Sequence, residues 1–166
     1  MLETVLDSVV GILTSAGINA CAKYPETKID RDTAIVCVSL RYGKISASGC
    51  GNYIGICDSG GTVTELYGSR AELCFALEMY SPAKSGFGAS GCVRLFDSVA
   101  AVMSAYPEGL RMRSFDYGEA EFDAESRMFR SVCELKCGAL LLREAEPETG
   151  VFTDFILRGE IDGYER

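Results

Sequence analysis

The stretch Ala71-Glu-Leu-Cys-Phe-Ala-Leu-Glu-Met-Tyr80-Ser-Pro-Ala-Lys-Ser-Gly-Phe-Gly-Ala-Ser-Gly91 decides the fold of this chain. In its first half apolar side chains alternate with smaller or acidic ones, and the apolar set is Leu73, Phe75, Leu77 and Met79. This alternation predicts a strand over 71–80 with one face covered and the other half exposed. The second half, Ser81–Gly91, is polar and rich in glycine, which predicts a bend.

The residues after this bend predict a helix and then a hairpin. Apolar residues recur at helical spacing until Pro107, namely Leu95, Phe96, Val99, Val102, Met103 and Tyr106. Two extended runs follow, Leu110–Phe122 and Arg127–Leu142, and they read as a hairpin around Asp123-Ala-Glu-Ser126.

The residues before the central strand predict a second helix and further strands. Leu2–Leu13 is amphipathic and is ended by Gly17, and Asn19–Tyr24 and Ala34–Arg41 read as strands. Between Gly43 and Gly68, glycines interleave with apolar residues, which is typical of a hairpin-forming excursion with bulges.

These elements predict a single α+β domain over 1–166. We expect one mixed, largely antiparallel sheet with two helices packed on one face and a long C-terminal hairpin. After a polar linker over Glu144–Gly150, Val151–Leu157 reads as a last strand, and residues 159–166 are expected to fray.

Composition excludes several classes of function. The net charge is −8 and no basic run is present, which disfavours sequence-specific binding of nucleic acid. No apolar run approaches the length of a membrane span, and the acidic start of the chain does not resemble a signal peptide, so we expect a cytoplasmic protein without membrane contact.

Residue content also disfavours catalysis and metal binding. The chain has no histidine, the commonest general base and metal ligand, and we predict that it is not an enzyme and carries no cofactor. The eight cysteines form no C-x-x-C pair, so we expect reduced, mostly buried thiols and no metal site.

The bend contains Gly86-Phe-Gly88-Ala-Ser-Gly91, which fits the G-x-G-x-x-G pattern of dinucleotide-binding loops. Against this interpretation, five residues separate the strand from the motif, and a hairpin follows instead of a second strand–helix unit. The simpler interpretation is a bend whose last glycine, or Ser90, caps the helix. A nucleotide- or phosphate-binding module remains the alternative function.

Two further groups of residues are candidates for contacts. Glu119, Glu121, Asp123 and Glu125 share one strand face, where they could bind a hard cation or simply be solvated with Phe122 turned inward. Tyr53, Ile54 and Tyr67 lie in the glycine-rich excursion, where they either form a contact surface or pack locally. The candidate interface residues are Tyr53, Ile54, Tyr67, Glu119 and Glu121.

The order of elements and several short phrases resemble the tail terminator and tail-completion (neck) proteins of long-tailed bacteriophages, particularly of prophages in Gram-positive bacteria. The phrases are Gly51-Asn-Tyr-Ile-Gly55, Glu65-Leu-Tyr-Gly68, Gly91-Cys-Val-Arg-Leu-Phe-Asp97, Gly118-Glu-Ala-Glu-Phe-Asp-Ala-Glu-Ser-Arg-Met-Phe-Arg130 and Phe152-Thr-Asp-Phe-Ile-Leu-Arg-Gly159.

This resemblance implies a structural protein that forms a ring, expected to be a hexamer, on the end of the tail tube. Its partners would be the tube and head-connector proteins, and it would be found in the host cytoplasm during assembly and then in the virion neck. The acidic composition agrees with a bore through which DNA passes without binding, because like charges repel.

Overall fold

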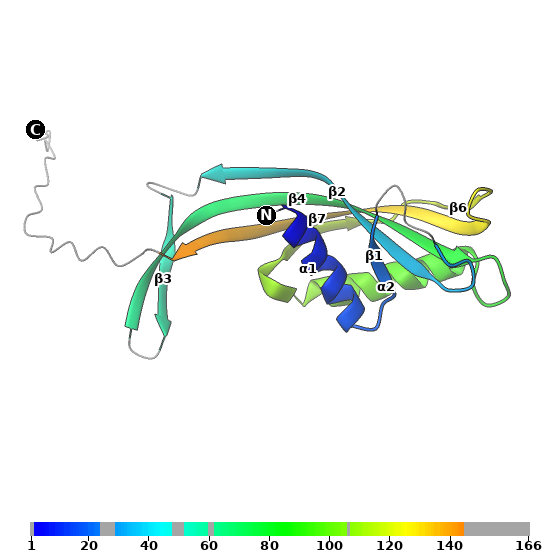
Figure 1. Ribbon diagram of the computed structural model, residues 1–166, viewed down its shortest axis with the longest axis horizontal. Helices are drawn as coiled ribbons and strands as arrows, with labels where there is room; N and C mark the ends of the chain where they lie inside the picture. The colour runs from blue at the N-terminus through cyan, green and yellow to red at the C-terminus, as the bar shows by residue number, and fades with distance from the viewer. Residues whose placement is uncertain (1, 24–28, 48–51, 60–61, 106, 145–166) are drawn as a thin grey trace, which may run out of the picture.

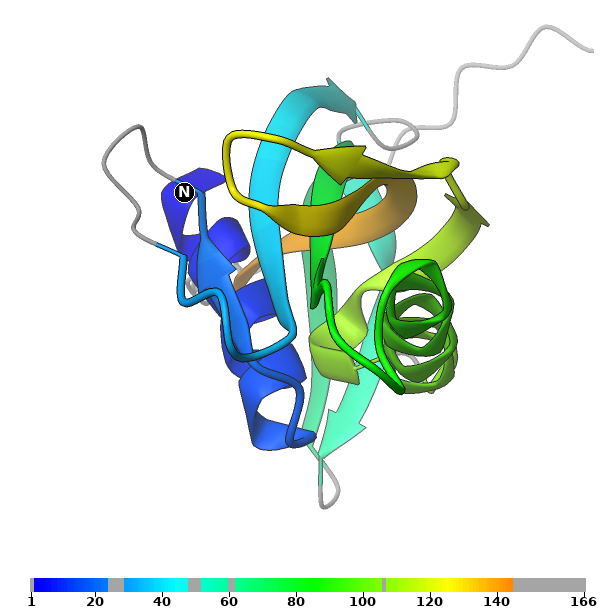
Figure 2. The same cartoon turned by 90° about the vertical axis from the view of Figure 1, so that its right-hand side faces the viewer.

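The computed structural model describes residues 2–23, 29–47, 52–59, 62–105 and 107–144. Within these residues the chain forms a seven-stranded mixed sheet with two α-helices against one of its faces, so the predicted α+β class is confirmed (Figures 1 and 2). The elements in order are α1 (Leu2–Ser15), β1 (Ala20–Ala22), β2 (Ile35–Ala47), β3 (Tyr53–Ser59), β4 (Thr62–Pro82), α2 (Ala89–Ser104), the short 3-10 helix η2 (Pro107–Gly109), β5 (Arg111–Asp116), β6 (Ala120–Asp123) and β7 (Met128–Glu144).

The sheet is built around the long strand β4. Its order is β1-β2-β4-β7-β5, with β3 also paired to β4 and β6 also paired to β7. Only the β1–β2 pair is parallel, and the other described pairs are antiparallel. The sheet is therefore mixed and largely antiparallel, as the sequence predicts.

The main core lies between the sheet and the two helices. Leu73, Phe75, Leu77 and Met79 of β4 point toward α1 and α2 and are almost completely buried. They pack with Leu6, Val9 and Leu13 of α1, Val99 and Met103 of α2, and apolar residues of β2 and β7. Figure 1 shows α1 and α2 on the same side of the sheet, which confirms the predicted placement of both helices.

The opposite face of β4 is also covered over its second half, so the expected half-exposed strand is wrong. Cys74, Ala76, Glu78 and Tyr80 are all buried. A second apolar cluster on this face joins Tyr80 to Ile35, Cys37 and Met128, with Cys21 and Ile29 packed against it. The acidic Glu78 suggested a solvated face, but this carboxylate is buried within an ion-pair network instead.

The strands on either side of the glycine-rich region are longer than the sequence predicts. β2 continues to Ala47, β4 begins at Thr62, and the glycine-rich region between them contributes the β3–β4 hairpin. The excursion over 43–68 is therefore a hairpin with a register shift between Tyr53 and Gly55, as predicted, but its two ends belong to long regular strands. The predicted strand Val151–Leu157 and the tail 159–166 lie outside the described residues.

The predicted C-terminal hairpin is formed by β5 and β6 pairing with β7 around a turn at 124–127. It is interrupted near Gly118, where an added Cβ atom would lie 2.0 Å from the Val132 carbonyl oxygen. Glycine is needed here because the two backbones approach too closely for any side chain.

The predicted end of α1 is confirmed, but the predicted start of α2 is not. Gly17 has a positive φ of 81°, and the Gly17 and Ile18 N–H groups donate to the Thr14 and Leu13 carbonyls, which closes α1. The N-cap of α2 is Gly88, not the predicted Gly91 or Ser90, because the helix begins at Ala89 and no side chain caps it. Neither described helix is long and apolar enough to cross a membrane.

Candidate functional site

The sheet extends well beyond the two helices and forms a thin arm (Figure 1). We define the arm as Arg41–Ala47 of β2, all of β3, Thr62–Arg70 of β4 and Ala139–Glu144 of β7. No described helix covers this part of the sheet (Figure 1). Side chains on the arm therefore face solvent unless another molecule or another part of the chain covers them.

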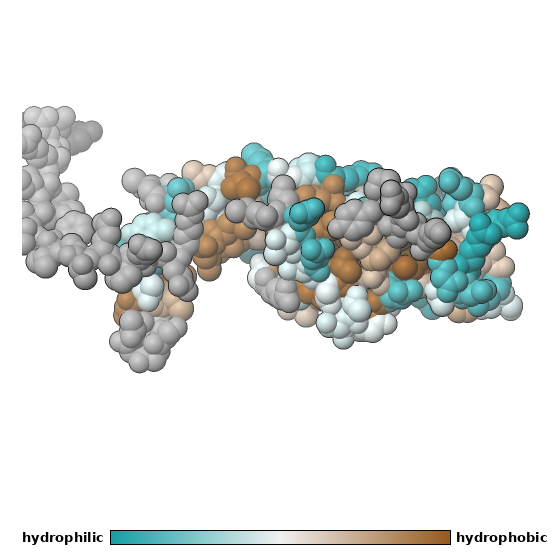
Figure 3. Space-filling view, in the orientation of Figure 1, coloured by the Kyte–Doolittle hydropathy of each residue, from teal (hydrophilic) through white to brown (hydrophobic). Residues whose placement is uncertain are grey.

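The arm carries most of the large hydrophobic side chains that are exposed among the described residues. They are Tyr42, Ile45, Tyr53, Ile56, Val63, Leu140 and Leu142, each more than two-fifths exposed. Figure 3 shows brown hydrophobic surface on the arm away from the helices. Grouped exposed apolar residues of this kind mark contact sites in soluble proteins, and the arm is the candidate site of this molecule.

The structure brings three of the predicted interface residues together on the arm. The rings of Tyr53 and Tyr67 meet edge to face with centroids 5.7 Å apart, and the Tyr67 hydroxyl donates to a Glu65 carboxylate oxygen. Ile54 lies against Gly68, where an added Cβ would be 2.9 Å from the Ile54 Cδ1 atom. These residues therefore pack against one another and still leave surface open to contact, since the Tyr53 side chain is 43% exposed.

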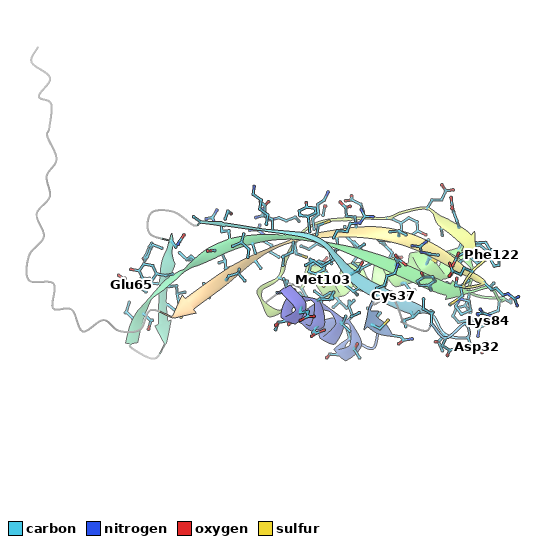
Figure 4. All side chains as sticks on the ribbon, turned by 45° about the horizontal axis from the view of Figure 1, so that its top comes forward. Asp32, Cys37, Glu65, Lys84, Met103 and Phe122 are labelled. Carbon is cyan, nitrogen blue, oxygen red and sulfur yellow. The ribbon has the colours of Figure 1, made fainter. Side chains whose placement is uncertain are left out.

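The other two predicted residues, Glu119 and Glu121, lie elsewhere. Both are exposed, Glu121 within β6 and Glu119 directly before it, at the opposite end of the molecule from the arm. Figure 4 shows this separation through Phe122, which neighbours Glu121, at one end and Glu65 at the other. The five predicted interface residues are thus not one surface.

The acidic residues around β6 form a turn and bring no metal cluster together. The Asp123 carboxylate accepts hydrogen bonds from the backbone N–H groups of Glu125 and Ser126, which fixes the turn and lowers the pKa of Asp123. No group of three His, Cys, Asp or Glu side chains in the described part of the chain could hold a metal ion. The expectation that Phe122 turns inward is wrong, because its side chain is 55% exposed, although its ring pairs edge to face with that of Phe129.

The glycine-rich bend closes on itself. The Lys84 and Gly88 N–H groups both donate to the Pro82 carbonyl, at 2.9 and 3.0 Å, and the Phe87 N–H donates to the Lys84 carbonyl. The Arg94 guanidinium donates to the Gly86 carbonyl, and the Lys84 ammonium to the Asp32 carbonyl. A phosphate could bind these backbone N–H groups only after they left their present acceptors, and nucleotide binding stays a prediction.

Gly91 lies in the first turn of α2 and packs directly on β4. An added Cβ would lie 2.0 Å from the Ser81 Oγ atom and 3.0 Å from its Cβ, and both residues are buried. The last glycine of the motif therefore serves close packing between helix and strand.

This contact predicts opposite effects for the same substitution on the two helices. Gly91→Ala should lower the free energy of unfolding by about 1–3 kcal/mol through overpacking against Ser81. Gly11→Ala on α1 should raise it by about 0.5–1 kcal/mol, because nothing lies within 4 Å of the added atom and alanine favours the helix. Urea titration of both variants measures this, and a Gly91→Ala variant as stable as the parent would show that Ser81 moves aside freely.

Glu78 is the most elaborately bound carboxylate in the described residues. Its Oε1 atom is paired with Lys23 and with Arg130 Nη2 (2.9 Å), and its Oε2 atom accepts from Tyr80 (2.8 Å) and Arg130 Nε (3.2 Å). Burial alone would raise the pKa of Glu78, but hydrogen bonds from Lys23, Arg130 and Tyr80 outweigh it and hold that pKa below its ordinary value. Because its oxygens are already engaged, Glu78 is a structural group and a poor general base.

The lowered pKa of Glu78 makes stability depend on pH. A folded-state pKa below the unfolded value contributes stability that is complete above the unfolded carboxyl pKa and is lost as pH falls through the folded pKa. We expect the free energy of unfolding to fall as the pH drops below about 4–5, the ordinary glutamate range. Urea titrations between neutral and acidic pH should show a flatter profile for Glu78→Gln, and identical profiles would contradict this assignment.

The cysteines behave as buried apolar residues, as predicted. Cys37, Cys74, Cys92, Cys133 and Cys137 are all buried, and Cys57 is exposed. Burial raises the pKa of Cys92 and of Cys137 to about 11, which keeps both thiols protonated at neutral pH. Cys21 and Cys37 lie on neighbouring strands with their sulfur atoms 3.6 Å apart. Cys50 lies outside the described residues.

The sequence indicated the tyrosines of the arm but missed its leucines and the end of β2. Leu140, Leu141 and Leu142 are consecutive, and successive residues of a strand point to opposite faces. Since Leu141 packs against the core, its two neighbours must point to the other face. Three consecutive leucines in a strand therefore indicate that apolar side chains lie on both faces of the sheet, including the face that the helices do not cover.

Comparison with known proteins gives no match to this chain, either among protein-family models or among curated proteins. The fold and the surface of the molecule therefore carry the functional argument.

Proposed function

We propose that this protein is a non-enzymatic structural protein of a bacteriophage tail, which caps the tail tube as a ring and joins it to the head connector. The observation that supports this proposal best is the arm, on which seven large apolar side chains are exposed and which no described helix covers. A surface of this kind suits a protein whose function is assembly.

Two further features agree with the proposal. Glu78, the buried carboxylate with the most partners, is fully engaged in an ion-pair network and is not available for chemistry. The net charge of −8 suits a ring that lets DNA pass, because it repels phosphate groups.

The experiment that tests the proposal is native molar mass by light scattering over a wide concentration range, with negative-stain imaging of the same samples. Closed rings, alone or on added tail tubes, support it. A chain that stays monomeric alone and does not bind tubes contradicts it, and stabilisation by a nucleotide would then favour the alternative module at Gly86–Gly91.

A matched pair of substitutions tests whether the arm is the contact surface. Ile56→Glu places a charge on the arm and should abolish association. Val93→Glu places the same charge on the solvent-exposed side of α2, away from the arm, and should leave association intact. Both side chains are exposed, so neither variant should unfold, and circular dichroism provides the check. Equal association of both variants and the parent would show that assembly uses another surface.

A further inference from the structure

The arm has two open margins, one on each side of β4. On one side β1 pairs with β2 only from Val36 to Val38, so no described strand lies beyond Ser39–Ala47, which we name the β2 margin. On the other side β5 pairs with β7 only as far as Gly138, so no described strand lies beyond Ala139–Glu144, which we name the β7 margin. An open strand margin presents backbone N–H and C=O groups that can pair with another strand.

The strand pattern tells which backbone groups face outward. The Val36 N–H donates to the Asn19 carbonyl on the outer side of β2, and the register shift after Leu40 moves this alternation by one residue. Gly43, Ile45 and Ala47 then present their N–H groups outward. On β7, the backbone groups of Lys136 and Gly138 face β5, where they lie opposite Ser114 and Arg111. Every second residue of a strand faces the same side, so Leu140 and Leu142 also present their N–H groups outward, beyond the end of β5.

The two margins are unlike and run in the same direction. β2 and β7 are both antiparallel to β4 and are therefore parallel to each other. Pairing of like margins closes after two copies, whereas pairing of unlike margins is head-to-tail and continues until a ring closes. Between copies related by rotation, such a pair is parallel.

We propose that the β2 margin of one copy pairs in parallel with the β7 margin of the next, so that the arms form one continuous sheet around the ring. This pairing rests on the proposed function, since it supplies the contact that a ring requires. Ile45 and Leu141 lie on the helix side of the sheet, opposite Ala71 and Ser69 of β4, so the pairing also places Ile45 of one copy beside Leu141 of its neighbour and removes the exposed surface of Ile45 from water. A second copy fits better than residues 151–157 of the same chain, because that segment could fill one margin only.

Proline substitutions on the two margins test the pairing. Ile45→Pro removes an outward N–H group from the β2 margin, and Leu142→Pro removes one from the β7 margin. Each variant alone should remain monomeric by light scattering, because every copy then lacks the same margin. An equal mixture should give dimers and nothing larger, since Ile45→Pro retains its β7 margin and Leu142→Pro retains its β2 margin. Ile45→Thr and Leu142→Thr keep the N–H groups and serve as controls, which should retain measurable ring formation.

Hydrogen exchange of the wild-type chain provides a second measurement that does not depend on folding of the proline variants. The amides of Gly43, Ile45, Leu140 and Leu142 should exchange about tenfold or more slowly in rings than in the diluted monomer. Rings without this protection, or a proline mixture that stays monomeric, overturn the pairing and leave the ring function standing. If only Leu142→Pro blocks assembly, the β7 margin takes another strand and the pairing is also wrong. A wild-type chain that never associates, alone or with tubes, overturns both.

Discussion

Replacing Phe75 with alanine is expected to lower the free energy of unfolding by about 3–5 kcal/mol. Phe75 lies in the middle of β4, is 0% exposed, and is the largest of the completely buried side chains in the core between the sheet and both helices. Alanine would leave a cavity in this core, and a packed interior relaxes only partly into such a space. Urea or thermal unfolding followed by circular dichroism measures the loss.

The matched control for Phe75 is the same substitution at Phe122. This ring is 55% exposed and contacts the edge of Phe129, so Phe122→Ala should cost no more than about 1 kcal/mol. A similar loss for both variants would mean that β4 is not the centre of the core. Because the arm lies outside the helix-covered core, residual association of folded Phe75→Ala molecules should be unchanged at low temperature.

Replacing Glu78 with alanine is expected to cost about 2–3 kcal/mol. The substitution leaves Lys23 and Arg130 without their shared buried partner, and loss of one member of a buried ion pair commonly costs several kcal/mol. The effect is smaller here than for a fully buried pair, because the Lys23 and Arg130 side chains are 41% and 36% exposed and can reach water. The Tyr80 hydroxyl also loses its acceptor.

Glu134→Ala is the control for charge removal on the same sheet face. Glu134 pairs with Arg41 at 2.8 Å and with Lys136 at 2.9 Å, but these partners are well exposed, and surface ion pairs contribute little. We expect a much smaller change than for Glu78→Ala in the same urea titration. Equal changes would show that burial does not strengthen the Glu78 network.

Most of the fold could be predicted from sequence because its elements carry regular patterns. The helical spacing in α1 and α2, the breaking residues Gly17 and Pro107, and the two long extended runs of the hairpin all correspond to described elements. Local signals of this kind do not depend on the partner of each strand, so the sequence alone was sufficient.

The surroundings of β4 could not be predicted, because they depend on contacts between distant segments. Glu78 is buried only because Lys23 and Arg130, far away in sequence, lie beside it in the sheet. A glutamate within an alternating pattern normally indicates a solvated face, and the pattern contains no information about such partners.

The candidate site was predicted in part for a similar reason. Tyr53, Ile54 and Tyr67 were visible as apolar residues among glycines, and they do lie on the arm. Glu119 and Glu121 were added as acidic residues that share one face of an extended strand, yet β6 is at the other end of the sheet. Strand order decides which surfaces are continuous, and it is a property of the whole chain.

The continuity of β4 has a mechanical consequence. Its 21 residues span roughly 70 Å at about 3.3 Å each, and the strand runs without a break from the tip of the arm through the core. It stays in register with β7 from Leu66 opposite Glu144 to Pro82 opposite Met128. A force pulling on the arm along its length would load this whole ladder in shear, with its hydrogen bonds sharing the load across the strands instead of opening one after another. The molecule is thus built to resist tension along the arm far better than peeling across it.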